Sequence, residues 1–421
     1  MCGIAGWFTF SGERPDRSVL EAMLERIAHR GPDHRGRYAH HNAVLGMTRL
    51  AINDLESGNQ PYFSEDRGVV AVFNGEIYNF RELRAELERL GHRFQSSTDG
   101  EVIVHLWEEH GEEFVHLLNG MFAIALYDGE RLHLFRDRFG IKPLHYTTVG
   151  GTLFFASELK SLLEVPNFDR ALDHAAVRSY LTLEYFPSPY TVFREAKKLA
   201  PGHRLQVTGA GVGEPRRYYG QVLFRGEPGQ SIEEWAERLR VELLASVKRR
   251  LIADVPLGVF LSGGLDSSTL ASLMTDLVPG SVKSFSVGFS EKSFDESAYS
   301  ELVSRHLGTE HHAQRLDSTT ALSVIKPLYQ SLDEPLADAA LIPTYLLARF
   351  AREHVTVALA GEGADELLGG YPTYFAHQVA NSLKGLPSWV FDLLRLTVNM
   401  LPTSRGYLSL DFKIKRFCSG L

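Results

Sequence analysis

The segment that most limits what this chain can fold into is MFAIALY, residues 121–127, which is apolar at every position. A β-strand points successive side chains to opposite faces, so this strand needs apolar cover on both faces of its sheet. Further strand-like segments occur at 3–10, 42–52, 68–78, 131–137 and 152–158, and Asp128-Gly129 signals a hairpin turn. Strands that cluster in this way indicate stacked antiparallel sheets, and we expect helical layers outside them.

Two amphipathic segments are candidates for those outer layers. Residues 79–91 carry an apolar stripe at helical spacing and end on Gly91, a suitable helix stop. Residues 101–111 show the same kind of ending. Residues 201–219 predict an edge hairpin that closes this part of the chain, and the Gly-rich, polar stretch 221–231 is the best linker candidate.

The pattern changes after this linker. Strand-like segments at 257–261, 282–289 and 355–361 alternate with helical segments, the first of which is the long amphipathic stretch 231–251. Such alternation is typical of a doubly wound parallel sheet. We therefore predict a chain of mixed α+β and α/β class, with one domain over residues 2–215 and a second over residues 216–421.

Composition excludes several classes of partner. A formal net charge of -8 argues against nucleic acid or an anionic membrane surface as the main partner. The N-terminus lacks a basic region followed by a long apolar segment, so we expect no signal peptide. The apolar stretch 388–401 contains Asp392 and Arg395 and is too short to span a bilayer. Cys2 and Cys418 are the only cysteines, which fits a reducing compartment, and we expect a cytoplasmic protein.

The strongest single motif is SGGLDSS, residues 262–268, between a predicted strand and a helix. Its glycines let the backbone approach an anion, and the helix that follows directs unpaired N–H groups at that anion. The motif lacks the lysine and the spacing of a Walker A loop, so it suits a pyrophosphate leaving group. Asp266 would lie beside that phosphate and is a candidate Mg²⁺ ligand. A Gly-Gly turn with a capping serine is the alternative interpretation.

A second motif, AGEGADE at 360–366, also follows a predicted strand. Loops at the carboxyl ends of the strands line the ligand crevice of a doubly wound sheet, so both motifs can face one site. Glu362, Asp365 and Glu366 place three carboxylates within this loop. Asp365 and Asp266 would make a metal pair. The alternative is a solvated acidic helix start, although a plain cap does not need two glycines.

Four polar motifs stand beside predicted strand ends in the first half. Arg49 has the geometry to pair bidentately with a carboxylate, and Glu76 and Asp99 could receive an α-ammonium group. The Asn74 side chain and the Gly75 N–H could stabilise an oxyanion. Each feature alone is explained equally well by turn chemistry or a surface ion pair. The motifs are HRGPD at 29–33, RLAIN at 49–53, NGEIYN at 74–79 and STDGE at 97–101.

Cys2 becomes the first residue if Met1 is removed, which the small size of cysteine permits. An N-terminal cysteine then carries a thiol with an ordinary pKa of ~8.5 beside an amine of ~7.7–8.0. That amine can accept the thiol proton directly or through a water, which makes Cys2 a candidate nucleophile. A buried structural cysteine is the alternative.

Taken together, these motifs resemble the glutamine-dependent asparagine synthetase family, over almost the whole chain and in the family's order. MCGIAGWF, HRGPD, RLAIN, NGEIYN, STDGE, GMFAIALYD and RDRFGIKPL resemble a class II glutamine amidotransferase domain. SGGLDSS, SFSVGF and AGEGADELLGGY resemble the ATP-pyrophosphatase domain. The resemblance implies an αββα N-terminal-nucleophile sandwich followed by a PP-loop domain. It also implies glutamine, ATP and aspartate as small-molecule substrates and Mg²⁺ as the metal, and it leaves a homodimer open.

The resemblance assigns roles to individual residues. Cys2 would attack the glutamine amide and release ammonia, with Asn74 and Gly75 as oxyanion donors and with Arg30 and Asp33 supporting the pocket. Ammonia would pass through an apolar tunnel, and Glu362 would assist formation and attack of an aspartyl-adenylate. The implied glutamine-binding residues are Arg49, Leu50, Ala51, Ile52, Asn53, Asn74, Gly75, Glu76 and Asp99. The implied ATP-binding residues are Phe260, Leu261, Ser262, Gly263, Gly264, Asp266, Ser267, Ser268, Val287, Ala360 and Gly361, with Asp266 and Asp365 as the metal ligands.

Two departures from the family pattern leave alternatives open. The chain ends at Leu421, whereas the family continues to a lysine that acts on the phosphates, so we expect a truncated chain. The acceptor loop 333–345 has Ala339 and Ala340 where relatives often have small hydroxyl residues. Another carboxylate, of cell-wall, glycan or peptide type, is therefore an alternative acceptor. Glutamine hydrolysis alone, or a regulatory glutamine- or nucleotide-binding module, are the further alternatives.

Overall fold

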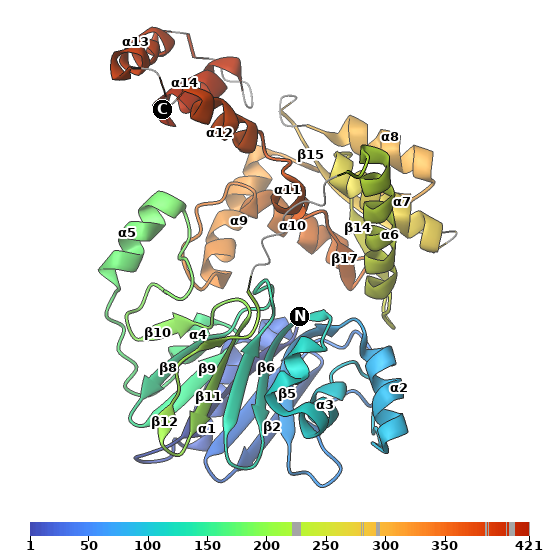
Figure 1. Ribbon diagram of the computed structural model, residues 1–421, viewed down its shortest axis with the longest axis vertical. Helices are drawn as coiled ribbons and strands as arrows, with labels where there is room; N and C mark the ends of the chain where they lie inside the picture. Colours follow the sequence, from blue (N-terminus) through green and yellow to red (C-terminus); the bar gives the residue numbers. More distant parts are fainter. Residues whose placement is uncertain are drawn as a thin grey trace. The chain divides into compact units, whose positions relative to one another are not determined.

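The computed structural model describes residues 1–220, 229–278, 280, 282–291, 295–383, 385, 387–400, 402–403 and 409–420. The chain forms two compact units (Figure 1). Unit 1 contains residues 1–255 and 326–341, and unit 2 contains residues 256–325 and 342–421. Of the predicted linker 221–231, residues 221–228 lie outside the described part of the chain. The domain boundary placed after residue 215 stays a prediction.

Unit 1 is built on two antiparallel sheets, as predicted. The first has the order β10-β8-β9-β1-β3-β2 and the second the order β12-β11-β7-β6-β5-β4, with β13 paired to β11. The strands of the first sheet are β1 (Gly3–Thr9), β2 (His34–His40), β3 (Ala43–Arg49), β8 (His145–Val149), β9 (Thr152–Ala156) and β10 (Ala196–Lys198). Those of the second are β4 (Tyr62–Phe63), β5 (Val70–Ile77), β6 (Gly120–Tyr127), β7 (Leu132–Arg136), β11 (His203–Thr208), β12 (Gly211–Val212) and β13 (Arg216–Arg217).

The apolar pattern of β6 explains the layering. Ala123 and Ala125 pack into the core between the two sheets, whereas Phe122 and Ile124 pack on the opposite face. That opposite face is covered by α2 (Phe80–Leu90) and α3 (Val102–His110), which Figure 1 shows beside β5. The outer face of the first sheet packs against α1 (Arg17–Arg26) and α4 (Leu159–Leu162). The predicted αββα sandwich is therefore confirmed.

Local signals place most element ends correctly. Helix α2 ends where expected, because Gly91 adopts φ 108°, a left-handed conformation that suits glycine at a helix end. Strands β2 and β16 (Glu310–Leu316) were not predicted. Both lie at sheet edges and carry mostly exposed or half-exposed polar residues, so neither shows the apolar pattern on which strand prediction depends.

Unit 2 contains the predicted parallel sheet, in the order β16-β15-β14-β17. Its remaining strands are β14 (Leu257–Phe260), β15 (Lys283–Phe289) and β17 (Val357–Leu359). The chain moves outward from β14 through β15 to β16 and then returns to place β17 on the other side of β14. The strand order therefore reverses between β14 and β17, which is where ligands bind in sheets of this type.

Helices complete both units. None of the described helices is long and apolar enough to cross a membrane. The other helices of unit 1 are η1 (Ala28–Arg30), η2 (Gly111–His116), α5 (His174–Leu183) and α6 (Ile232–Arg250), with α9 (Ser318–Ser331) shared between the units. Those of unit 2 are α7 (Leu265–Leu277), α8 (Ser297–Leu307), α10 (Leu341–Arg352), α11 (Ala364–Leu368), α12 (Pro372–Leu383), α13 (Ser388–Asn399) and α14 (Leu410–Gly420).

Candidate active sites

The candidate site of unit 1 lies where β1 begins and β5 ends, between the two sheets. Cys2 directly precedes β1 and packs against the inter-sheet core that contains Ile4. Side chains alternate along a strand, so Asn74 and Glu76 point to the same side of β5 as Val72, which belongs to that core. The thiol, the amide and one carboxylate therefore face the same inter-sheet space.

The thiol of Cys2 is held in its protonated form. Its sulfur lies 3.7 Å from the carbonyl oxygen of Leu50, to which it donates a hydrogen bond. Burial raises the pKa of the Cys2 thiol, the carboxylates of Glu76 and Asp99 add to the rise, and the N-terminal ammonium opposes it. Because a thiolate is the nucleophilic form, Cys2 needs a base beside it in order to react.

Two buried carboxylates form the acidic part of this site. Burial raises the pKa of Glu76 well above its ordinary value, and the nearby Asp99 carboxylate raises it further. Burial likewise raises the pKa of Asp99 to about 6, although Ile77 N donates to its Oδ2 at 2.7 Å. Asn53 Nδ2 donates to Glu76 Oε2 at 3.0 Å. A cationic ligand group would relieve the repulsion between these two carboxylates.

The amide of Asn74 is a buried polar group of this site that no described residue satisfies. Its side chain is 1% exposed, and neither Nδ2 nor Oδ1 has a hydrogen-bond partner among the described residues. An unsatisfied buried polar group costs about 1–3 kcal/mol, so such groups need an explanation. The neighbouring Gly75 has no room for a side chain, since a Cβ there would lie 2.1 Å from the oxygen of Met121.

The loop 49–54 lies beside this site, and the Arg49 side chain hydrogen-bonds to acceptors in and near this loop. The Arg49 guanidinium donates to Asn59 Oδ1 at 2.9 Å, to the Asn53 oxygen at 2.9 Å and to the Asp54 oxygen at 2.6 Å. It is 5% exposed, so a substrate carboxylate would have to share it with these loop acceptors. The assignment of Arg49 as a carboxylate partner stays a prediction.

The rest of this loop is fixed through its backbone. Asp33 Oδ2 accepts from Ala51 N at 2.8 Å, and the Ile52 oxygen accepts from Asp254 N at 2.9 Å. Since the Leu50 oxygen receives the Cys2 thiol hydrogen bond, the predicted glutamine-binding segment 49–53 is brought beside the thiol. All of these residues belong to unit 1.

Two cations near Cys2 also shape the site. Arg30 Nε donates to the Cys2 carbonyl oxygen at 2.8 Å, and its Nη1 donates to Glu158 Oε1 at 2.7 Å. Lys142 had no predicted role, yet burial lowers its pKa and it interacts electrostatically with Glu76 and Cys2. The sequence offered one signal for such a role, because Lys142 is the single cation in the apolar stretch GIKPL.

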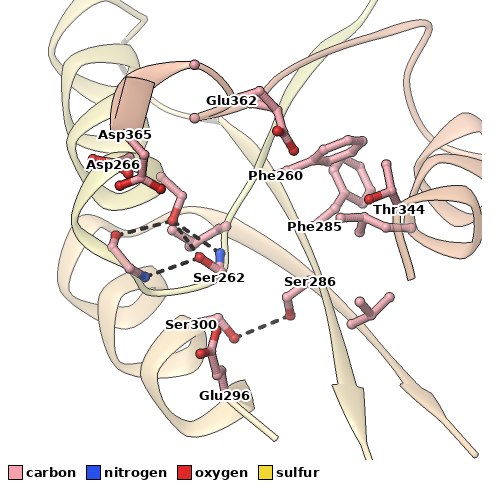
Figure 2. Close-up of a pocket in the computed structure, with 18 of the residues that line it drawn as sticks. Phe260, Ser262, Asp266, Phe285, Ser286, Glu296, Ser300, Thr344, Glu362 and Asp365 are labelled. Carbon is pink, nitrogen blue, oxygen red and sulfur yellow. Dashed lines mark hydrogen bonds between the residues drawn. The ribbon is translucent and has the colours of Figure 1, made fainter. Parts of the chain in front are cut away.

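The candidate site of unit 2 is a cavity of about 450 Å³ at the carboxyl ends of β14 and β17. Figure 2 shows side chains from β14, from β15, from α10 and from the loop after β17 converging on it. Every predicted ATP-binding residue lines this cavity except Gly263 and Ser268. The lining residues from the prediction are Phe260, Leu261, Ser262, Gly264, Asp266, Ser267, Val287, Ala360 and Gly361.

Gly263 and Ser268, the two predicted residues that do not line the cavity, belong to the same motif as those that do. Gly263 adopts φ +83°, and a Cβ there would lie 2.6 Å from Tyr299. Ser268 Oγ is buried without a hydrogen-bond partner among the described residues. Helix α7 starts at Leu265, earlier than expected, and Ser262 Oγ lies 3.0 Å from Ser267 Oγ. The first turn of α7 therefore lines the cavity with Asp266 and Ser267, and the N-terminus of a helix suits an anion.

Carboxylates gather on one side of the same cavity. Asp266, Asp365 and Glu362 all line it, and all three are labelled in Figure 2. The loop after β17 packs closely on α7, since a Cβ on Gly361 would lie 3.0 Å from that of Asp266. Carboxylate oxygens beside a phosphate-binding loop are the ligands that Mg²⁺ prefers, so these residues fit the ion.

Sequence similarity agrees with this two-site arrangement. Residues 1–219 match the glutamine amidotransferase domain family, and residues 238–412 match the asparagine synthase family. The chain is 36% identical to asparagine synthetase (glutamine-hydrolyzing) 1 of Bacillus subtilis, over 100% of this chain and 66% of that protein. It is 34% identical to a Methanocaldococcus jannaschii protein provisionally named asparagine synthetase (glutamine-hydrolyzing) 2, over 96% of this chain and 81% of that protein.

A fungal relative carries a different name. The amidase chry2 of Gibberella zeae is 32% identical over 96% of this chain and 64% of its own length. The chain thus spans between 64% and 81% of the length of these three relatives.

The fold and the family match over residues 1–219 define a glutamine amidotransferase domain that is followed along the chain by a parallel α/β unit. Within that class, the chain belongs to the glutamine-hydrolysing asparagine synthetase family.

Proposed function

We propose that this protein hydrolyses glutamine at Cys2 and uses the ammonia to amidate aspartate at the expense of ATP. The products are asparagine, glutamate, AMP and pyrophosphate. The observation that carries the proposal is the buried, unpartnered amide of Asn74, which faces the same inter-sheet space as the Cys2 thiol. The names of the bacterial and archaeal relatives support the same reaction.

The proposed chemistry in unit 1 begins with removal of Met1. The freed amine of Cys2 takes the thiol proton, and the thiolate attacks the carboxamide carbon of glutamine. Asn74 Nδ2 and Gly75 N donate to the oxyanion that forms. The C–N bond then breaks, the amine returns its proton to the leaving nitrogen as ammonia, and water hydrolyses the γ-glutamyl thioester to glutamate.

Glutamine recognition rests on the two buried carboxylates. The α-ammonium group of glutamine would lie between Glu76 and Asp99, which lack a cationic partner strong enough to keep their pKa values low. Arg49 would share its guanidinium with the α-carboxylate. Loop 49–53 would hold the substrate against the thiol, because the Leu50 carbonyl already contacts Cys2.

In unit 2, the proposed reaction joins the β-carboxylate of aspartate to the α-phosphorus of ATP and releases pyrophosphate. Ser262, Gly264 and Ser267 line the phosphate end of the cavity, and Phe260 and Val287 lie where the nucleoside would bind. Asp266 and Asp365 would hold Mg²⁺, which neutralises phosphate charge when bound. Glu362 would receive a proton as ammonia attacks the aspartyl-adenylate.

The decisive experiment replaces the thiol and follows both half-reactions. Cys2→Ala should abolish glutamine hydrolysis and glutamine-driven AMP formation while leaving ammonia-driven AMP formation unchanged. Cys418→Ala is the matched control, since Cys418 is the other free cysteine and has no proposed role in the reaction. Retention of glutaminase activity in Cys2→Ala would contradict the proposal for unit 1. Absence of aspartate- and ammonia-dependent AMP release from the full-length protein would contradict it for unit 2.

A different carboxylate acceptor is the second candidate. Ala339 and Ala340 precede α10 in the predicted acceptor loop, and a fungal relative is named an amidase. An acceptor screen with ATP and ammonia, read as AMP formation, separates the two. Faster AMP formation with a cell-wall, glycan or peptide carboxylate than with aspartate would favour this second candidate.

A further inference from the structure

Four metal-binding side chains meet in unit 1 at a place that the proposed reaction does not use. Glu65 follows β4, His92 follows α2, and His105 and Glu108 lie three residues apart on α3. Each of the four offers one ligand atom, and these atoms all lie within 4.8 Å of one another. The cluster belongs to the layer formed by α2 and α3 beside the second sheet (Figure 1).

The measured separations match a tetrahedral metal site. Glu65 Oε1 lies 3.2 Å from His92 Nδ1, and Glu65 Oε2 lies 3.3 Å from His105 Nδ1. Glu108 Oε2 lies 3.7 Å from His92 Nδ1 and 3.5 Å from His105 Nδ1. Zinc bonds of ~2.0–2.2 Å in a tetrahedron place ligand atoms ~3.3–3.6 Å apart. These four separations are close to that range, although the two that involve Glu65 use different oxygens, and one ligand atom from each residue lies within 4.8 Å of the others.

His105 supplies an independent indication. Its side chain is 1% exposed, and neither Nδ1 nor Nε2 makes a geometrically acceptable hydrogen bond to a described residue. A buried imidazole in that condition is costly unless something unseen contacts it. Its Nδ1 is the atom that faces Glu65 and Glu108, so the unpartnered nitrogen points into the cluster.

His92 also has the outer partner of a metal ligand. It directs Nδ1 to the shared centre, and its Nε2 lies 3.1 Å from Glu109 Oε1. His105 likewise directs Nδ1 to the shared centre, but its Nε2 lies 3.9 Å from Glu101 Oε1, which is too long for a hydrogen bond. A carboxylate behind a ligating histidine is the usual arrangement in zinc sites, where it sets the tautomer and orients the ring.

We propose that Glu65, His92, His105 and Glu108 bind one Zn²⁺ ion with a structural role. Two neutral imidazoles and two carboxylates balance the charge of a divalent cation. The ligand set is closed, with four protein ligands and no open position, which is typical of a structural zinc site. Imidazole and carboxylate ligands in tetrahedral geometry favour zinc over Mg²⁺ or Ca²⁺.

The metal would fix the segment that carries the predicted glutamine contacts. Residues 92 and 105 are ligands on either side of the loop 97–101, which contains Asp99. Glu101 connects the segment before this loop to α3. It accepts hydrogen bonds from Gln95 N at 2.7 Å and Ser96 N at 2.8 Å, and its carboxylate faces His105. Zinc binding would therefore hold this loop in place without contacting substrate.

Protonated histidines provide the competing explanation. Burial alone lowers the pKa of His105, but the carboxylates of Glu101 and Glu65 raise it overall. A protonated His105 paired with these carboxylates would explain the cluster without an ion. The two explanations differ in metal stoichiometry.

The test uses the full, untagged chain, stripped with a chelator and titrated with ZnCl₂ at pH 7.5. We expect one Zn²⁺ per chain by elemental analysis, a higher melting temperature on zinc addition, and the visible d–d absorption of tetrahedral N/O-coordinated Co²⁺. Glu65→Gln and His92→Gln should lose stoichiometric binding. Glu109→Gln should weaken zinc affinity about 10–100-fold, as expected for a carboxylate behind a ligand.

His116→Gln is the matched control, because His116 pairs with Glu113 at 3.4 Å outside the cluster. It should bind zinc like the wild type. Glu65 is exposed, so Glu65→Gln tests the site even if a variant of the buried His105 does not fold. Failure of the wild-type chain to bind one zinc, or equal binding by Glu65→Gln and His116→Gln, would overturn the proposal. Neither result bears on the chemistry of Cys2, which Cys2→Ala tests separately.

Discussion

At the scale of single residues, the candidate site of unit 1 contains two neighbouring carboxylates, Glu76 and Asp99, whose negative charge the folded chain does not fully compensate. Burial raises the pKa of Asp99 to about 6, and Glu76 lies close enough to add to the repulsion. The ordinary pKa of an aspartate is ~3.9, so its charged form is disfavoured in the fold. Such a carboxylate lowers stability at neutral pH, and a substrate ammonium group would offset that loss.

The Asp99→Asn variant tests this trade-off. The folded pKa lies above the unfolded one, so the native state takes up a proton between about pH 6 and pH 4 and gains stability as the pH falls. We therefore expect Asp99→Asn to stabilise the protein by ~1–3 kcal/mol at pH 7, while glutamine hydrolysis is lost. Denaturant unfolding measures the gain, which should shrink towards zero near pH 4. A gain that persists unchanged at pH 4 would show that charge is not its cause.

Removal of Met1 is a second prediction at this scale. The amine of Cys2 can act as a base only when Met1 has been removed. In the chain that still carries Met1, burial raises the pKa of the Cys2 thiol. Protein prepared with Met1 retained should hydrolyse glutamine at least about 10²-fold more slowly, the usual loss when general base catalysis is removed. Intact-mass spectrometry identifies the processed fraction. Equal glutaminase rates in the two preparations would refute the role of the amine.

At the scale of elements, the start of α7 decides the shape of the phosphate loop. Gly264 precedes the first helical residue, and Gly263 adopts φ +83° directly behind the cavity. A β-carbon at Gly263 would meet Tyr299 at 2.6 Å, where α8 packs against the loop. The path of the loop before α7 is therefore constrained by a close contact between Gly263 and α8.

Gly263→Ala and Gly308→Ala form a matched pair at the element scale. Both glycines have positive φ, but a Cβ on Gly308, at φ +70°, would meet nothing within 4 Å. Gly308→Ala should cost ~1 kcal/mol through backbone strain alone, and Gly263→Ala ~2–4 kcal/mol because a collision is added. Urea unfolding measures both, and ATP-dependent AMP formation should fall only for Gly263→Ala. Equal costs would mean that the contact with Tyr299 is unimportant.

At the scale of the whole molecule, a segment from the second half of the sequence belongs to unit 1. Residues 326–341 are grouped with 1–255. Asp333 accepts from Leu159 N at 2.7 Å, and Glu334 accepts from Val192 N at 2.7 Å and pairs with Lys198 at 2.6 Å. The beginning of the predicted acceptor loop therefore contributes to the fold of the amidotransferase unit.

Glu334→Gln should destabilise unit 1 selectively. The Glu334 and Lys198 side chains are 11% and 17% exposed, so removing one charge leaves the other largely buried. We expect a loss of ~2–4 kcal/mol in the unfolding transition of unit 1 and none in that of unit 2. Glu21→Gln, which breaks an exposed pair with Arg37, should cost less than about 1 kcal/mol. A shift of both transitions in Glu334→Gln would show that the units unfold together.

The period of the apolar pattern was enough to predict the architecture. Apolar residues on both faces of 121–127 predicted stacked antiparallel sheets with helical layers outside them, and strand–helix alternation after residue 231 predicted a parallel sheet. Both were confirmed. Edge strands β2 and β16 were not predicted, because half-exposed strands of mostly polar residues do not show the apolar alternation that marks a strand in the sequence. The order of motifs along the chain likewise predicted the family to which it belongs.

The sequence by itself determined the layers, the parallel sheet and the two motif-bearing loops, because these depend on local periodicity and on residue types at fixed spacing. Only the tertiary structure decided that Asn74 is buried without a partner, that Lys142 lies near Cys2 and that Glu65 joins His92 and His105. Those features join residues far apart in the chain. Burial and charge interaction depend on distance in space, which no local pattern records.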